Sequence, residues 1–241
     1  MDPIYDCSRV VDIADEPRHH LVLANEFVRA FVVEIPPGDR ALCHRHPQDY
    51  LLYSASASEI ISAARDEEPK RLSYRDGECE SLSAGLVHVV DNIGASPVRN
   101  VVVELWPRAG ELRRGSNPKW VGEEWIGGNQ NISQILNGER AAIFKIGIEP
   151  GAEVEISGPA ILATPYGNRL SLDAIADAEV KSHPVCDLAW IPPAAAAILW
   201  GCWEKTESAI VFQLGFADEQ GFAVSNVRNP LRSLKAHAES E

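Results

Sequence analysis

Two histidines lie close together in the segment GDRALCHRH, residues 38–46, which reads as a β-strand that follows a turn. Side chains alternate between the two faces of a strand, so His44 and His46 are expected to point to the same side. Cys43 and Arg45 then point away. Two imidazoles in this arrangement can chelate a metal ion, although such pairs are more often solvated or packed than ligating.

A second segment, GECESLSAGLVHVVDN at residues 77–92, supplies a third histidine. It begins at Gly77, passes through a tight Ser-Ala-Gly turn that ends at Gly85, and then reaches His88 and Asn92. We expect Asn92 to shape the turn after its strand rather than to contact a substrate.

The elements that could position these histidines are strands. Short runs rich in β-branched and apolar residues recur between turn signals such as PPGD, RDGE and NIGASP, and little of the chain reads as helix. A strand about every 8–12 residues favours an antiparallel sandwich or barrel over a βαβ sheet. The predicted fold class is therefore all-β and antiparallel.

The sequence also repeats itself. Residues 25–40 resemble residues 137–153, and residues 86–105 resemble residues 195–214, each as a strand, a turn and a closing strand. We therefore expect two copies of one barrel. The predicted divisions are an N-terminal barrel at 1–106, a linker at 107–130, a C-terminal barrel at 131–218 and a tail at 219–241.

Composition limits the function classes. The 241 residues are 45% hydrophobic, which is enough for a sizeable core, and the formal net charge of −13 opposes binding to nucleic acid or to an anionic membrane surface. No apolar run approaches the roughly 20 residues that span a bilayer. We expect a cytoplasmic protein whose partner is a small molecule, and the sequence leaves a homodimer open.

The number and spacing of the cysteines are consistent with a cytoplasmic location. Their number is odd, they are scattered, and none forms a CxxC pair. We expect free thiols in a reducing compartment, most of them buried as small apolar residues. The five are Cys7, Cys43, Cys79, Cys186 and Cys202.

The two histidine segments resemble the paired motifs of cupins. The first cupin motif is Gly, five residues, His-x-His, three or four residues and usually Glu. The second is Gly, five residues, Pro-x-Gly, two residues, His, three residues and Asn. Ser83 stands at the usual proline. The residues that match at every other interval are Gly38, His44, His46, Gly77, Gly85, His88 and Asn92.

This resemblance implies tandem jelly-roll barrels in which His44, His46 and His88 converge inside the mouth of the first barrel and bind one divalent transition metal. Neutral imidazole suits Fe(II), which we favour, and also Mn, Ni, Zn and Cu. Three protein nitrogens leave coordination positions open for water or substrate, as expected of a catalytic metal.

The chain departs from the cupin pattern at the acidic ligand, because Tyr50 and Leu51 occupy the two positions where the glutamate usually stands. The resemblance then implies a three-histidine site, as in cupin dioxygenases that cleave diketones or oxidise thiols. Tyr50 is a candidate hydrogen-bond partner for a metal-bound water or substrate, or else an aromatic that lines the barrel. Gln48 is a candidate neutral oxygen ligand.

The second copy has lost the ligands. Ser157, Gly158 and Pro159 fall on the His44–His46 segment, and Ala197 falls on His88. We therefore expect a structural barrel there. The remaining histidines fit neither motif and are excluded from the site; they are His19, His20, His183 and His237.

The predicted function is that of a metal-binding bicupin, an enzyme that acts on a small organic molecule, such as a three-His Fe(II) dioxygenase. A metal-dependent isomerase or lyase and a non-catalytic ligand-binding or sensory cupin are the alternatives, since a fold does not fix a function.

Overall fold

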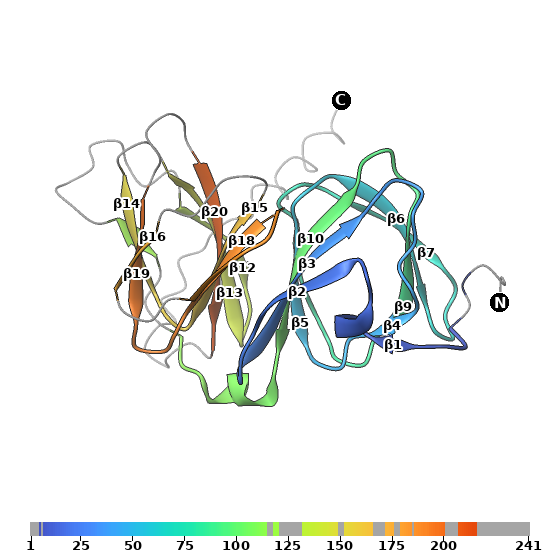
Figure 1. The fold of residues 1–241 in the computed structure, drawn as a ribbon, viewed down its shortest axis with the longest axis horizontal. Helices are drawn as coiled ribbons and strands as arrows, with labels where there is room; N and C mark the ends of the chain where they lie inside the picture. The colour runs from blue at the N-terminus through green and yellow to red at the C-terminus, as the bar shows by residue number, and fades with distance from the viewer. Residues whose placement is uncertain are drawn as a thin grey trace, which may run out of the picture.

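The computed structural model describes residues 5, 7–114, 118–120, 132–148, 152–165, 172–175, 179–184, 186–200 and 207–215. Within these ranges the chain is built almost entirely from strands (Figure 1), which confirms the predicted all-β class. Two short 3-10 helices, η2 (Ile13–Asp15) and η3 (Pro107–Glu111), interrupt them. The predicted tail, residues 219–241, lies outside the described residues.

The first barrel consists of two five-stranded sheets that face each other. Apart from the short parallel pair β1–β4, their strands are antiparallel. In order across the first sheet these are β1 (Val11–Asp12), β4 (His44–Arg45), β9 (Val87–Asn92), β6 (Ser58–Ala64) and β7 (Lys70–Tyr74). Across the second sheet they are β2 (His19–Ala24), β3 (Val28–Ile35), β10 (Val98–Leu105), β5 (Tyr50–Ser54) and β8 (Cys79–Leu82).

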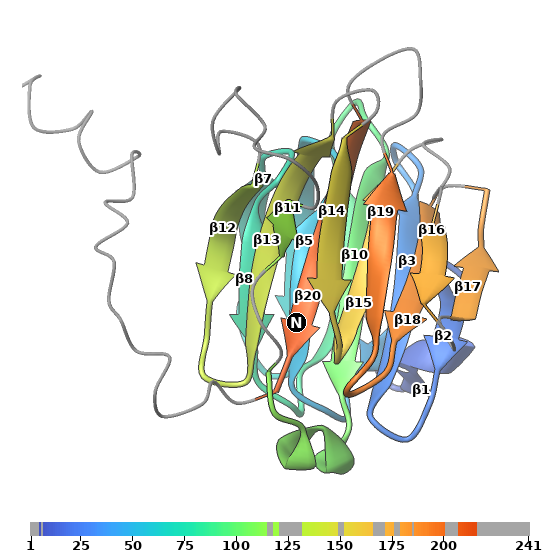
Figure 2. The ribbon, with the colours of Figure 1, turned by 90° about the vertical axis from the view of Figure 1, so that its left-hand side faces the viewer.

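The second barrel repeats this plan with a third and a fourth sheet, which lie one behind the other when seen from its end (Figure 2). The third sheet orders β11 (Lys119–Trp120), β14 (Glu153–Ser157), β19 (Ala196–Trp200) and β16 (Leu172–Ile175). The fourth orders β12 (Ile132–Asn137), β13 (Ala141–Ile148), β20 (Glu207–Leu214), β15 (Ala160–Pro165), β18 (Cys186–Ile191) and β17 (Glu179–Ser182).

The internal repeat appears in the register of the strands. In the first barrel β3 pairs with β10 so that Ile35 lies opposite Val98. In the second barrel β13 pairs with β20 so that Ile148 lies opposite Glu207. In each barrel, the last residue of the earlier strand lies opposite the first residue of the later strand, so the two copies share one plan. The exact boundaries of the linker stay a prediction.

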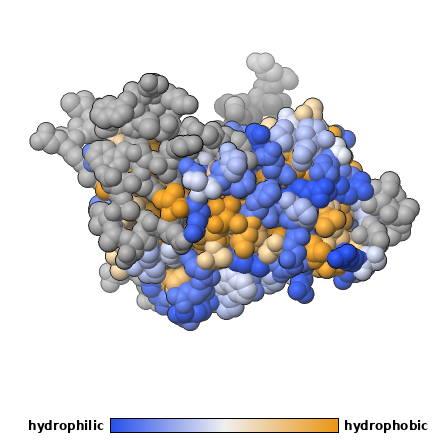
Figure 3. Space-filling view, in the orientation of Figure 1, coloured by the Kyte–Doolittle hydropathy of each residue, from blue (hydrophilic) through white to orange (hydrophobic). Residues whose placement is uncertain are grey.

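The second sheet is buried on both faces, which places the core and the contact between the barrels. Alternate residues of β3 lie in different apolar layers. Phe31 and Val33 face the interior of the first barrel, while Ala30 and Val32 pack into a layer shared with the fourth sheet. Figure 3 shows apolar side chains that reach the surface where the two barrels meet. Leu21 of β2 and Val180 of β17 are exposed apolar residues on two strands that contact each other between the barrels.

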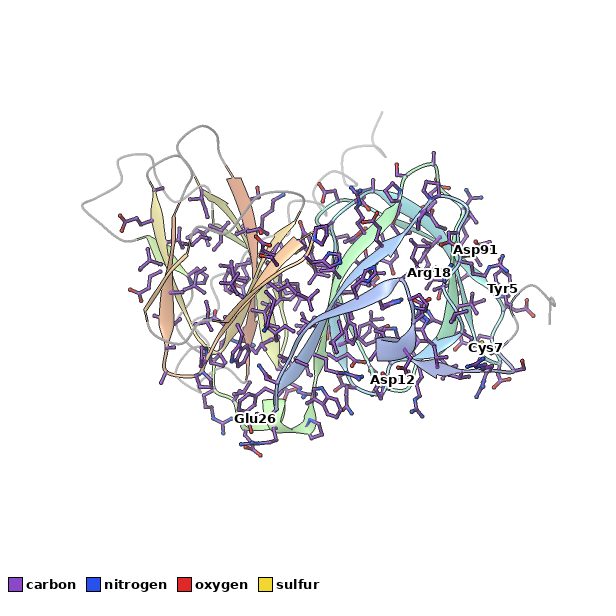
Figure 4. The ribbon with its side chains drawn as sticks, viewed as in Figure 1. Tyr5, Cys7, Asp12, Arg18, Glu26 and Asp91 are labelled. Carbon is purple, nitrogen blue, oxygen red and sulfur yellow. A yellow bond between two sulfur atoms is a disulfide. The ribbon has the colours of Figure 1, made fainter. Side chains whose placement is uncertain are left out.

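The expectation of free thiols is wrong for Cys7 and Cys43, which form a disulfide. Cys7 lies beside Tyr5 at the end of the first barrel that is farthest from the second (Figure 4). The bond ties the N-terminal segment to the loop before β4, a contact between residues too distant in the sequence for spacing to reveal. Cys79 and Cys186 are free, as expected, and Cys202 lies outside the described residues.

No helix in the described part of the chain is long and apolar enough to cross a membrane.

Candidate metal centre

The paired motifs place their histidines side by side at one end of the first barrel. His44 in β4 lies directly opposite His88 in β9, and their Nε2 atoms are 3.1 Å apart. His46 follows β4 by one residue, and its backbone is held by hydrogen bonds with Leu86 and Gly85. The ring centroid of His46 lies 5.1 Å from that of His44 and 5.3 Å from that of His88. All three side chains are buried.

Two of these rings have a hydrogen-bond partner on Nδ1, which leaves Nε2 for another role. The Nδ1–H of His44 donates to the carbonyl oxygen of Leu42 at 2.8 Å. The Nδ1 of His88 lies 3.0 Å from the hydroxyl of Ser62. Ligating histidines usually have such a partner on the second nitrogen, because it fixes the tautomer and the ring orientation.

His46 differs from the other two, because its Nδ1 is buried without a hydrogen-bond partner. An unpartnered buried ring nitrogen costs free energy unless something else satisfies it. A metal ion bound at this nitrogen would satisfy it, and three buried imidazoles are ligands that divalent transition metals accept, so the residues present fit such a metal.

His19 was excluded by its sequence context, and the structure corrects that exclusion. It begins β2 in the opposite sheet, and its ring lies 4.5 Å from that of His44. One nitrogen from each of His19, His44 and His46 lies within 4.8 Å of the others. No motif marked His19, because it reaches the site through the pairing of β2 with β3 rather than through a local spacing.

Burial keeps the three motif histidines neutral. It lowers the pKa of His44 to about 4, with the nearby His19 adding to the effect. Burial also lowers the pKa of His46 and of His88 well below the ordinary value, and neighbouring imidazoles lower both further. A neutral imidazole has the lone pair that a metal needs, so the site is ready to bind a cation at pH 7.

Glu16 is the buried acid beside this cluster. Burial alone would raise its pKa, but hydrogen bonds from His19 and from the backbone of Leu42 and Arg18 outweigh that effect and hold the pKa at about 2. Glu16 is therefore a carboxylate at neutral pH.

A cavity of about 280 Å³, lined at one end by His19, His46 and His88, extends into the first barrel. Aliphatic side chains from both sheets form most of its wall, and the polar part includes Tyr50, Tyr74, Glu80 and Asn100. Within the described residues, no lysine or arginine lines it. The cavity suits a small, mainly apolar molecule.

The two candidate catalytic residues have different positions. Tyr50 lines the cavity and stacks on His46, with ring centroids 4.1 Å apart. Burial raises the pKa of Tyr50, so its hydroxyl stays protonated and can donate a hydrogen bond. Gln48 is half-buried and, within the described chain, is not among the residues that line the cavity. Its role as a ligand stays a prediction.

Two neighbouring polar residues have structural roles. Asn92 donates from Nδ2 to the carbonyls of Ile35 and Ser96 and accepts from the backbone of Gly94, so it shapes the turn after β9. Asp49 forms an ion pair with Arg140 of the second barrel.

The second barrel has apolar residues at the corresponding place. Ile156 of β14 lies opposite Ala197 of β19, as His44 lies opposite His88, and both are fully buried in an apolar core. Ser157 lies one position further along, opposite Ala196, so the sequence alignment of the first motif is shifted by one residue. No metal-binding cluster is found among the described residues of this barrel.

We expect the metal-free protein to lose stability as the pH falls from about 6.5 to 4. The pKa of His44 is near 6.5 in the unfolded chain and about 4 in the folded protein, so protons bind preferentially to the unfolded state in this window. The contribution of His44 to the free energy of unfolding is constant above pH 6.5. Preferential protonation of His44 in the unfolded chain lowers that free energy by on the order of 3 kcal/mol by pH 4.

Urea unfolding in the presence of a chelator, at pH 7, 5 and 4, measures this loss. The variant His44→Leu is the control and should show a weaker pH dependence. An equal pH dependence in both proteins would contradict the assignment to His44.

Comparisons with known proteins bear on the fold. No family model matches the sequence, and no curated protein matches it. Among solved structures, AerE from Microcystis aeruginosa is similar over 83% of this chain and 98% of its own, with 12% identity and a TM-score of 0.54. The chain has the bicupin fold.

Two further structures are similar to this bicupin fold, one over most of the chain and one over a smaller part. A salicylate 1,2-dioxygenase variant from Pseudoaminobacter salicylatoxidans, in complex with gentisate, covers 84% of this chain and 75% of its own, with 11% identity and a TM-score of 0.50. A cupin domain from Bordetella pertussis covers 36% of this chain and 90% of its own, with 21% identity and a TM-score of 0.35. At these identities the likeness to AerE and to the dioxygenase variant shows the fold alone, and nothing is inferred from the likeness to the cupin domain.

Proposed function

We propose that the first barrel binds one divalent transition metal, preferably Fe(II), through His44, His46 and His88, and that the loaded cavity acts on a small organic molecule. The observation that carries this proposal is the grouping of three buried, neutral imidazoles at one end of the first barrel, where His46 and His88 line the cavity. A bound metal would supply Lewis acidity and open positions for substrate or O₂.

The residues of the chain provide the rest of the site. The aliphatic wall offers water few hydrogen-bond partners, and Tyr50, whose ring stacks on that of His46, has a protonated hydroxyl that can donate to an oxygen atom of the substrate. The only carboxylate in the described wall is that of Glu80, and no cation there balances a second one. The proposed substrate is therefore a molecule without a carboxylate that binds the metal through oxygen or sulfur, as a 1,3-diketone enolate or a thiolate does.

Oxygen uptake by the Fe(II)-loaded protein tests this function. A dioxygenase inserts both atoms of O₂ into its substrate, so uptake with a diketone or a thiol should match product formation mole for mole. Gentisate and salicylate should react poorly, because their carboxylates meet no basic side chain in the described wall.

The control for this assay is a His46→Ala variant treated with the same iron, which should consume no oxygen. A wild-type protein that holds one equivalent of iron but consumes no oxygen with the whole panel would favour the non-catalytic alternative.

A cytoplasmic location and a homodimer also stay predictions. The disulfide between Cys7 and Cys43 weighs against a reducing compartment, because such compartments keep most thiols reduced.

A further inference from the structure

The first motif lacks its acidic ligand, and the structure offers another group on the other side of the same site. Tyr50 and Leu51 hold the positions where the acid would stand. His19, at the start of β2, lies in the same sheet as these two residues, with β3 and β10 between them, whereas His44 and His88 belong to the opposite sheet. A ligand from β2 would therefore link the two sheets of the barrel through the metal.

The distances allow His19 to join the coordination sphere. Nitrogens that bind one metal ion at about 2.1 Å lie about 3.0–3.6 Å apart, and only a trans pair reaches about 4.2 Å. One nitrogen from each of His19, His44 and His46 lies within 4.8 Å of the others. Side-chain movements on the order of 1 Å therefore bring them to coordinating distance.

Hydrogen bonds to Glu16 fix which nitrogen of His19 faces the site. Oε1 of Glu16 accepts the backbone N–H of Leu42 at 3.1 Å, and Oε2 accepts that of Arg18 at 2.7 Å. Because both oxygens accept backbone N–H groups, the side chain is a carboxylate. In the neutral ring that a metal requires, the Nδ1 of His19, 2.6 Å from Oε2, carries the proton, which leaves the lone pair on Nε2.

The same carboxylate reaches a second ring through one residue, Leu42. Glu16 holds the N–H of Leu42, and the carbonyl of Leu42 accepts the Nδ1–H of His44 at 2.8 Å. Glu16 thus orients His19 directly and supports the loop that orients His44. Glu16 is itself buried, with 1% of its surface exposed, so water competes little for these bonds.

We propose that His19 completes the metal site as a fourth imidazole ligand, and that Glu16 is the positioning residue for His19 and, through Leu42, for His44. This inference rests on the proposed metal site. It makes the site a four-histidine one that leaves fewer open positions than a three-histidine site.

The first test counts ligands in the wild-type protein. X-ray absorption of the Zn(II)-loaded chain should show four imidazole nitrogens around the metal. Three imidazoles with a water or another oxygen in the fourth position would overturn the assignment of His19.

The second test compares the variants His19→Gln and Glu16→Gln with His20→Gln. His20 is the next residue of β2, is exposed, and contacts His183 rather than the site. Zn(II) affinity is measured by competition with a chelator, and the Cu(II)-loaded forms are compared by electron paramagnetic resonance. His19→Gln should weaken binding by about 100-fold or more, and Glu16→Gln by about 10–100-fold, each with a changed Cu(II) spectrum. His20→Gln should match the wild type.

The outcomes separate the two proposals. If His44→Ala abolishes binding while His19→Gln keeps the wild-type affinity and spectrum, the three-histidine site stands and the fourth ligand falls. If His44→Ala also keeps its metal, the proposed function itself fails. A Glu16→Gln variant with unchanged affinity and spectrum would remove the positioning role of Glu16.

Discussion

Replacement of His46 by alanine is expected to abolish stoichiometric metal binding without destabilising the metal-free protein. Loss of one directly coordinating imidazole should cost more than the roughly 10–100-fold in affinity that is typical of changes outside the first coordination shell. His46 is the cleanest of the histidines to remove, because its Nδ1 makes no hydrogen bond that would be lost.

The stability of the metal-free protein gives the second half of this expectation. The folded state carries a buried, unpartnered nitrogen at His46, and the substitution removes it. Against this, the variant loses the stacking of the ring on Tyr50 and leaves space in a region that already holds a cavity. We expect these effects to offset each other, so that the free energy of unfolding changes by less than about 1 kcal/mol.

Elemental analysis, chelator competition and urea unfolding of the metal-free forms measure both halves. The wild type should hold about one metal per chain, because the cluster lies in the first barrel and the corresponding place in the second holds Ile156 and Ala197. Ala197→Ser is the control and should leave the metal content unchanged. A His46→Ala protein with full occupancy would remove His46 from the ligand set.

The parts of this site that the sequence predicted depend on local geometry. The two-residue period of a strand places His44 and His46 on one side, and the structure brings them together with His88. The repeat likewise predicted a second barrel with the same plan, because each copy carries its own strand pattern and turns.

The parts that the sequence did not reveal depend on long-range pairing. His19 joins the cluster because β2 pairs with β3 at the edge of the opposite sheet, and nothing in its neighbourhood distinguishes it from a surface histidine. Glu16 gains its role from a contact with Leu42, and Cys7 gains its partner in the same region of the chain. The one-residue shift at Ile156 has a similar cause, since only cross-strand register fixes that alignment.

Removal of the second barrel is expected to make the first barrel aggregate. The outer face of the second sheet carries Ala30, Val32, Val101 and Val103, which pack into one apolar cluster with the fourth sheet. These side chains are at most 2% exposed in the full chain. Deletion of residues 131–241 would expose a contiguous apolar face that monomeric proteins rarely carry.

A point substitution probes the same contact within the full chain. Phe212 of β20 is fully buried in the shared cluster, and its replacement by alanine should cost about 3–5 kcal/mol through lost burial and the space left behind. Because the histidines lie on the far side of the second sheet from this contact, the folded variant should still bind about one metal per chain.

Size-exclusion chromatography of the truncated chain, and urea unfolding with metal analysis of Phe212→Ala, provide the measurements. Lys145→Ala is a suitable control, because Lys145 is an exposed residue of β13 in the same sheet and should change stability little. A monomeric, fully metallated fragment of residues 1–130 would show that the first barrel needs no partner. In that case the second barrel would have to be retained for a reason other than covering this face, since its own interior holds apolar side chains where the first barrel holds its histidines.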